Sequence, residues 1–283
     1  MWLWLTLLTT LGFSLGHVLV KKGYADLSPA QTKALDTFFY LLILVPYALL
    51  RGEIVFTHLE ILVVFGLVVG INYCLYLKGI AKGKISLVQN IYSTSPIFVL
   101  ILASVFLKEK LSLLQVMLIV LIVAAAVLTG LPKNVKQETT GIKFEKWFFW
   151  GLLGALVIGI NDILAKKAVD ITTATTVIFL FPIIDIPVAL GFLWIEKKPF
   201  PPIFKGKSFS TSLGVLINNV AALSFYEAAG IGKISLISGI LGSISLLTAA
   251  LAFLFLKEKI DRRQAIGIGL VSLCVSLLGL LST

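Results

Sequence analysis

The sequence predicts an all-α membrane protein with ten transmembrane helices, arranged as two inverted five-helix repeats. Composition is the first of three observations behind this fold class: the 283 residues are 58% hydrophobic and 13% charged, with a mean hydropathy of +1.03. Soluble domains carry about 25% charged residues, so a soluble globular protein is excluded. The other two observations are the length of the apolar segments and a repeated motif.

Ten apolar segments have about the length of a helix that crosses a bilayer, for which roughly 20 residues are needed. Transmembrane β-strands are about half as long and alternate in polarity, whereas these segments are apolar on all sides. Helices also satisfy every backbone polar group in lipid. The expected spans are residues 2–20, 32–50, 59–80, 85–107, 113–131, 147–165, 174–195, 208–229, 234–256 and 265–281.

We expect two units joined by a polar linker. The first apolar segment lacks the positively charged start and the A-x-A-like cleavage site of a secretory signal, so it is interpreted as a retained first helix. The most polar stretch between spans covers residues 132–144. The expected five-helix units are therefore residues 1–131 and 145–283.

A repeated motif relates the two units. The sequence GKISL at 83–87 recurs at 232–236, and FLKEK at 106–110 recurs at 255–259, each 149 residues later. Because each unit holds an odd number of helices, the second copy enters the bilayer from the opposite side. Inverted repeats of this kind surround a central site in many secondary transporters.

The end of this motif resembles that of the EamA-type members of the drug/metabolite transporter superfamily. In that family the fourth helix contains a Ser-Pro pair and ends in Phe-Leu-Gly-Glu, which is similar to Ser95-Pro96 and to the sequence FLKE at 106–109. The chain departs from the family at Lys108, and at Ser245, which stands where the second copy would carry a proline. The resemblance implies a small-metabolite carrier, often an exporter, with its substrate bound in a central cavity between the halves.

Positive charge is unevenly distributed between the spans. Of the 24 Lys and Arg residues, 18 follow odd-numbered spans and 6 follow even-numbered ones. The positive-inside rule then places both termini outside the cell, whereas members of the resembling family usually keep both termini in the cytoplasm, and both orientations stay open. Because the basic residues lie between spans, the net charge of +10 indicates orientation in a membrane, expected to be the cell (inner) membrane, and not nucleic-acid binding.

Three ionisable side chains inside the spans are candidates for ion or proton coupling, because such residues are costly in lipid and are functional hypotheses by default. Asp185 lies between Pro182 and Pro187, where a broken hydrogen-bond ladder would expose carbonyl groups. The alternative is a carboxylate satisfied by a neighbouring helix. The other two candidates occupy equivalent positions in the two halves, where water at the helix end is the alternative: His17 and Asp162.

Uncharged polar residues gather on several expected helices and form the candidate substrate cavity. Residues three apart, such as Tyr73 and Tyr76, share one helix face, which indicates that these helices turn a polar side to the interior. Each residue alone is equally compatible with packing or with a hydrogen bond between helices. The candidates are Asn72, Tyr73, Tyr76, Gln89, Tyr92, Ser93, Asn161, Asn218 and Asn219.

Enzyme signatures are missing from the sequence. There is no H-E-x-x-H pattern, the Gly-Lys-Ser at 206–208 lacks the first glycine of a phosphate loop, and both cysteines lie within apolar segments. We therefore expect no catalytic residues, no metal and no cofactor.

The expected function is secondary active transport, with export preferred, of a small metabolite such as an amino acid or a cationic or amphipathic compound. A central cavity would be exposed alternately to the two sides. The expected partners are the small-molecule substrate, the lipid bilayer and a coupling proton or ion, and the chain is either a monomer or a homodimer. The alternatives are a flippase for a lipid-linked group and a non-transporting membrane receptor or assembly protein.

Overall fold

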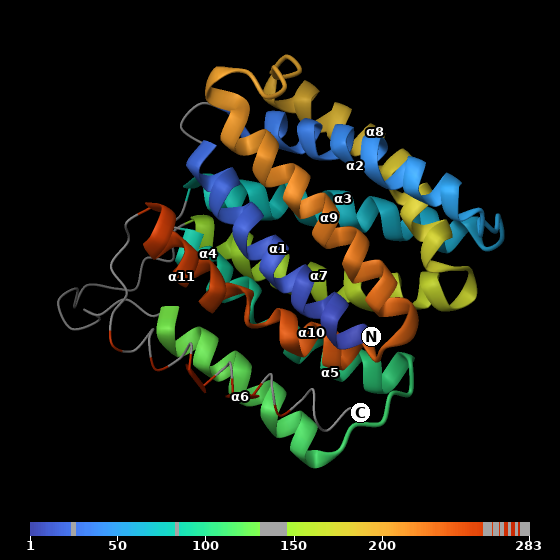
Figure 1. Cartoon of the computed structure of the whole chain (residues 1–283), viewed down its shortest axis with the longest axis vertical. Helices are drawn as coiled ribbons and strands as arrows, with labels where there is room; N and C mark the ends of the chain where they lie inside the picture. Colours follow the sequence, from blue (N-terminus) through green and yellow to red (C-terminus); the bar gives the residue numbers. More distant parts are fainter. Residues whose placement is uncertain are drawn as a thin grey trace.

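The computed structural model is helical throughout its regular elements (Figure 1). It describes residues 1–23, 27–82, 85–130 and 146–256, together with seven positions between Arg262 and Leu277. The helices are α1 (Trp2–Gly23), α2 (Pro29–Arg51), α3 (Leu59–Lys82), α4 (Ile85–Tyr92), α5 (Ser95–Phe106), α6 (Leu113–Gly130), α7 (Lys146–Ile171), α8 (Ala174–Glu196), the short 3-10 turn η1 (Gly206–Ser208), α9 (Phe209–Ile231), α10 (Ile234–Leu241) and α11 (Ile244–Leu256).

Six stretches among the described residues are long and apolar enough to cross a membrane: α1, α2, α3, α8, α9, and α10 taken with α11. Most expected spans agree with a helix to within a few residues, although α7 continues past its expected end at residue 165 to Ile171. The expected linker at 132–144 and most of the expected span at 265–281 lie outside the described residues. The count of ten spans therefore stays a prediction.

Local side-chain chemistry marks where the helices begin and end. Ser28 accepts a hydrogen bond from the backbone N–H of Gln31, whose side chain bonds back to Ser28, and this capping box opens α2. Gly52 ends the same helix with a φ of 74°, a left-handed conformation that costs glycine nothing. The hydroxyl of Thr173 caps α8 by accepting from the N–H of Thr176 at 3.0 Å. These caps satisfy backbone groups that would otherwise be unpaired at the ends of the spans.

Two expected spans are broken in the middle, which corrects the prediction of single helices at 85–107 and 234–256. The first break separates α4 from α5, where Pro96 lacks the N–H needed to continue the helix. The second separates α10 from α11 without a proline. There, the hydroxyl of Ser243 donates to the carbonyl of Ile240 at 2.6 Å and so competes with the helical bond, directly after Gly242.

The two breaks lie against each other in the centre of the bundle. A Cβ atom added to Gly242 would come within 3.1 Å of Cγ of Pro96, so only glycine allows this approach without displacing its neighbour. The half-helices also cross over, since α5 packs against α10 and α4 packs against α11. The interruptions in the two halves therefore form a single central feature.

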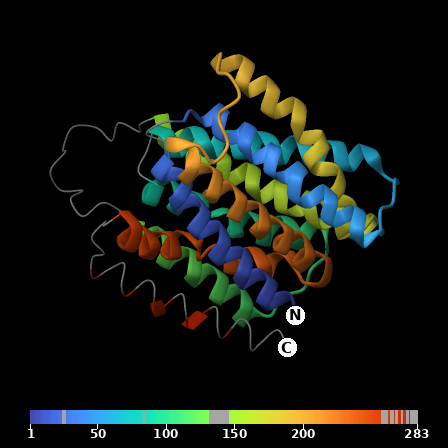
Figure 2. The same ribbon diagram turned by 45° about the horizontal axis from the view of Figure 1, so that its top comes forward.

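The packing of the two halves is reciprocal. The first helix of each half packs against the third helix of the other, because α1 lies along α9 and α3 lies along α7 (Figures 1 and 2). The second helices, α2 and α8, pack against each other. If each helix is replaced by its counterpart in the other half, the same pairs of helices remain in contact, with few exceptions. A two-fold relation between the halves requires this pattern.

The first helices of the two halves run in opposite directions. Gly12 faces Ala221 and Gly23 faces Thr211, so α1 and α9 are antiparallel. Near the C-terminal ends of α7 and α9, Nζ of Lys166 donates to the carbonyl of Ala229 at 3.0 Å, so these two helices are parallel. It follows that α1 and α7 are antiparallel to each other.

Glu109 connects the halves at the end of the repeated motif. Its Oε1 accepts from the N–H of Ile234 at 2.9 Å, and its Oε2 accepts from the N–H of Ser235 at 3.2 Å and from the Ser235 hydroxyl. The carboxylate thus satisfies the first free N–H groups of α10, where the helix dipole also favours a negative charge. Glu109, in the first half, therefore caps α10 of the second half.

Substitution of Gly16 by Ala is expected to lower stability by about 1–3 kcal/mol, because overpacking has a cost of this size. The added Cβ would lie 2.6 Å from the carbonyl oxygen of Gly214 and would overlap the amide of Asn218. The measurement is the melting temperature of the purified protein in detergent.

The matched control is Gly191→Ala in α8, where no neighbouring atom lies within 4 Å of the added Cβ. We expect this variant to melt at or above the wild-type temperature, since alanine is the better helix former. Equal melting temperatures for the two variants would contradict the close packing of α1 and α9.

Candidate functional site

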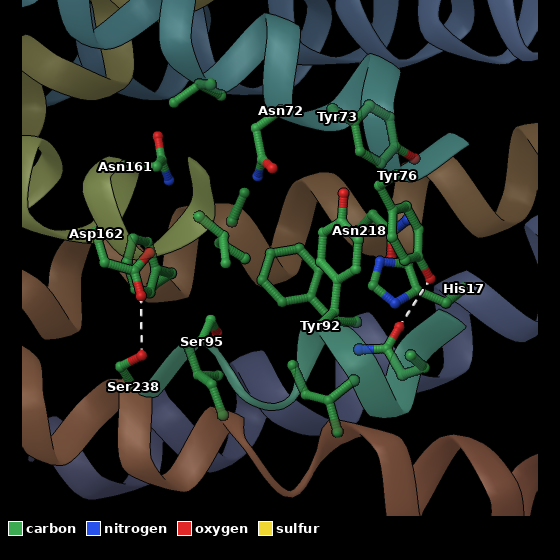
Figure 3. A pocket seen from close by; sticks show the side chains of 18 of the residues that line it. His17, Asn72, Tyr73, Tyr76, Tyr92, Ser95, Asn161, Asp162, Asn218 and Ser238 are labelled. Carbon is green, nitrogen blue, oxygen red and sulfur yellow. Dashed lines mark hydrogen bonds between the residues drawn. The ribbon is translucent and has the colours of Figure 1, made fainter. Parts of the chain in front are cut away.

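A central cavity of about 150 Å³ lies between the two halves (Figure 3). Asn72 and Asn218 reach it from near the middle of α3 and α9, which places the polar wall close to the midplane of the spans. Both helix breaks also contribute lining residues, through Ser95 and Leu241. This is the position at which substrate sites occur in transporters built from repeats.

The structure brings together ten of the twelve side chains that the sequence analysis selects. They come from α1, α3, α4, α7 and α9 and from the turn that follows α4, and no single helix supplies more than three of them. The ten lining residues are His17, Asn72, Tyr73, Tyr76, Gln89, Tyr92, Ser93, Asn161, Asp162 and Asn218. The two that do not line it are Asp185 and Asn219.

Aromatic rings form one wall of the cavity. Tyr76 is at the centre of this wall: its ring centroid lies 4.9 Å from that of Tyr92 in an edge-to-face contact and 4.7 Å from that of His17. Its hydroxyl donates to Oε1 of Gln89 at 2.8 Å, which fixes the ring (Figure 3). Phe225 and Tyr226, both on α9, add further aromatic surface to the lining.

Several polar atoms around the cavity are buried and have no hydrogen-bond partner among the described residues. Both amide atoms of Asn218 are in this state, as are Oδ1 of Asn72 and Oδ1 of Asn161. Leaving a buried polar group unpaired costs about 1–3 kcal/mol. Together with the Tyr92 hydroxyl, these atoms give the cavity unused donors and acceptors on three sides.

His17 and Asp162 face the cavity from equivalent positions on α1 and α7. Asp162 is 4% exposed and accepts a hydrogen bond from Oγ of Ser238 at 3.0 Å (Figure 3). Gln89, the counterpart of Ser238 in the first half, lies beside His17. The sequence alternative of water at a helix end is wrong for Asp162, because α7 continues to Ile171 and the carboxylate is buried.

Behind the cavity lies a cluster of three buried charges. Nζ of Lys33 is 2.5 Å from Oδ2 of Asp185 and 3.2 Å from Oδ2 of Asp36, and the three side chains are 0%, 0% and 1% exposed. Asp185 thus does have a partner on a neighbouring helix, the alternative left open above, and its role in coupling stays a prediction. Asn219 also belongs here, since its amide donates to Oδ1 of Asp36 at 3.0 Å.

Sequence reasoning misses Lys33 and Asp36. Both lie inside the expected span at 32–50, three residues apart, so the rule that flags ionisable residues in lipid would have found them. The count of basic residues instead assigns Lys33 to the polar residues after the first span, and its burial in α2 corrects that assignment. Asp36 is the member of the cluster that also lines the cavity.

Comparison with known proteins gives the family. The model of the EamA-like transporter family matches residues 1–131 and 145–280. A relative named "Probable purine permease 4" from Arabidopsis thaliana is 30% identical over 213 residues, which cover 69% of this chain. The chain spans 54% of the length of that relative.

A solved crystal structure shares the fold, with a TM-score of 0.72 over 97% of both chains at 14% identity. The family model covers most of the chain in two copies, and the apolar helices surround a polar central cavity. The chain therefore belongs to the EamA-like transporter family, and its apolar helices identify it as a multi-pass membrane protein.

Proposed function

We propose that the protein is a secondary transporter of small planar heteroaromatic molecules, such as purine bases, and that it works by alternating access around the central cavity. The observation that carries this substrate class is the combination of unpaired amide groups with aromatic rings in one buried space. Asparagine amides both donate and accept, which suits the mixed edge of a purine. Aromatic side chains favour stacked or edge-on contacts with a flat ring.

The name of the Arabidopsis relative supports the same substrate class, since it describes a probable purine permease. A second candidate is a cationic or amphipathic compound, as the sequence analysis expects. Two carboxylates, Asp36 and Asp162, line the cavity and would attract a cation, and so would the aromatic wall. Export is the direction that the family resemblance favours.

The proposed mechanism depends on two inverted five-helix repeats, residues 1–131 and 145–283, joined by the linker at 132–144. Reciprocal packing of the halves and the opposite directions of α1 and α7 support this organisation. In such an arrangement each half supplies one gate, and the two gates open at opposite ends of the molecule.

One lysine contact stands at each end of the bundle. Nζ of Lys21 donates to the carbonyl of Ile80 at 2.7 Å, and Nζ of Lys166 donates to that of Ala229 at 3.0 Å. In both cases a lysine near the C-terminal end of the first helix of a half bonds a carbonyl group in the last turn of the third helix of the same half. Carbonyl groups in a last turn lack helical partners. We assign these contacts to the two gates.

Counterflow of adenine into proteoliposomes tests the substrate class. We expect Asn161→Leu and Tyr92→Phe to reduce the initial rate at low adenine concentration by about 5- to 100-fold, because a lost polar contact to a ligand costs roughly 1–3 kcal/mol. The matched control is Tyr47→Phe, whose hydroxyl bonds Glu227 at 2.9 Å outside the cavity and whose loss should leave the rate unchanged.

Counterflow of a quaternary amine without counterflow of adenine or hypoxanthine would replace the first candidate with the second. Absence of exchange for every soluble compound, with a folded protein, would favour the flippase or the non-transporting receptor.

The gate assignment predicts that Lys21→Met and Lys166→Met act at opposite ends. Spin labels at Lys22 and Ala81 report one end, and labels at Lys167 and Gly230 report the other; all four positions are exposed. Distances measured by double electron–electron resonance, with Cys74 and Cys274 replaced by serine, should lengthen for the first pair only in Lys21→Met. The distance of the second pair should lengthen only in Lys166→Met. Equal lengthening of both distances in either variant would refute the assignment.

A further inference from the structure

The buried cluster behind the cavity contains an unbalanced charge. Lys33 supplies one ammonium group, and Asp36 and Asp185 supply two carboxylates. No other Lys or Arg of the described chain forms an ion pair with either carboxylate. With all three groups ionised, a net negative charge would remain in a site that is at most 1% exposed, and such an uncompensated buried charge is strongly unfavourable.

The hydrogen bonds distinguish the two carboxylates. Oδ2 of Asp185 accepts from Nζ of Lys33 at 2.5 Å and also from the hydroxyl of Thr37 at 2.5 Å. Asp36 has the longer contact with Lys33, at 3.2 Å, and one neutral donor, the amide of Asn219. Asp185 thus has the shorter contact with the charged donor and a second donor on the same oxygen, so it is the closer partner of Lys33.

The groups that face Asp36 from the surrounding helices do not balance the charge. Its own helix contributes Tyr40, α3 contributes Tyr73 and Cys74, and α9 contributes Tyr226. These side chains are ordinarily neutral at pH 7. Across the cavity stand His17 on α1 and Asp162 on α7, and the carboxylate of Asp162 adds repulsion.

The tyrosine rings also stabilise Lys33 in its charged form. Its Nζ lies 5.3 Å from the ring centroid of Tyr73 and 5.8 Å from that of Tyr40, within the range of cation–π attraction. A change in charge of the cluster therefore falls on Asp36, which is also the member that lines the cavity.

We propose that Lys33, Asp36 and Asp185 form a proton-binding site, in which Asp36 binds and releases one proton from the cavity while Asp185 stays paired with Lys33. The proton adds to a carboxylate oxygen of Asp36 and makes the cluster neutral, and its release returns the cluster to a charge of minus one. Substrate contact reaches the site through α9, because Asn218 lines the cavity and the adjacent Asn219 bonds Asp36.

The existence of the site does not require a particular substrate, but its use in transport rests on the proposed function. Alternate exposure of the cavity would present Asp36 first to one side of the membrane and then to the other. A proton gradient could then drive accumulation of substrate, with the proton carried by Asp36.

Infrared difference spectroscopy of the full chain in liposomes, without substrate, tests the site directly. In an Asp162→Asn background, which removes the other buried carboxylate of the cavity, protein with an intact cluster should show a protonated-carboxyl C=O band at pH 7 that is lost as the pH is raised. Asp36→Asn should lack this band. So should Asp185→Asn, in which Lys33 is left with Asp36 alone and holds it ionised, so the test survives if one variant fails to fold.

The matched control is Asp170→Asn on α7, an exposed carboxylate paired with Lys166 at 2.7 Å, and it should keep the band. A titrating band that persists in both cluster variants would overturn the proposal, as would the absence of a band in protein with an intact cluster.

Stability provides a second readout. If Asp36 holds a proton in the folded state at pH values where it is ionised in the unfolded chain, the folded state binds more protons, and the melting temperature should fall as the pH rises from 5 to 8. Asp36→Asn should reduce the difference in bound protons between the folded and unfolded states, which this slope reports, by up to one proton. Asp170→Asn should leave it unchanged. An unchanged slope in Asp36→Asn would contradict the proposal.

Transport assays separate the two proposals. Accumulation of adenine driven by a pH gradient should be lost in Asp36→Asn and retained in Glu60→Gln, whose side chain at the start of α3 is 72% exposed. A carboxyl band that depends on Asp36, together with no adenine counterflow in wild-type protein, would keep the proton site and refute the substrate class. Adenine counterflow without the band would do the reverse.

Discussion

The bilayer provides no water to satisfy a polar group, and this constraint determines how the rest of the structure is organised. Backbone groups are satisfied by helices, and where a helix breaks, the break is placed in the centre of the bundle beside the cavity. The buried ammonium group of Lys33 is paired with Asp185. Polar side chains without a partner gather at the cavity, where a ligand can supply what the protein does not.

Close helix packing makes this arrangement possible. Glycines of α1 and α3 allow neighbouring helices to approach until backbone meets side chain: Gly16 faces Asn218, and Gly70 faces the carboxylate of Asp185. The glycine at 70 leaves the space that Asp185 occupies, so the charge cluster depends on α3 as well as on the helices that carry the charges. Packing and electrostatics are therefore joined at the same positions.

Much of the fold follows from sequence because length and hydropathy are properties of single segments. The cavity residues were accessible for a similar reason, since an amide such as Asn161 is conspicuous in an apolar helix. Interactions between distant segments were not accessible. The break at Gly242 has no proline to mark it, and the partner of Lys33 lies 152 residues away in α8. The depth of Asp162 was missed because helix α7 extends beyond its apolar stretch.

The cap that Glu109 provides to α10 has a consequence for biogenesis. A chain emerges from the ribosome with its N-terminal part first, so Glu109 is in place before Ile234 and Ser235 are synthesised. The carboxylate that caps α10 is therefore made 125 residues before the first N–H group that it accepts from. The second half by itself would lack this cap.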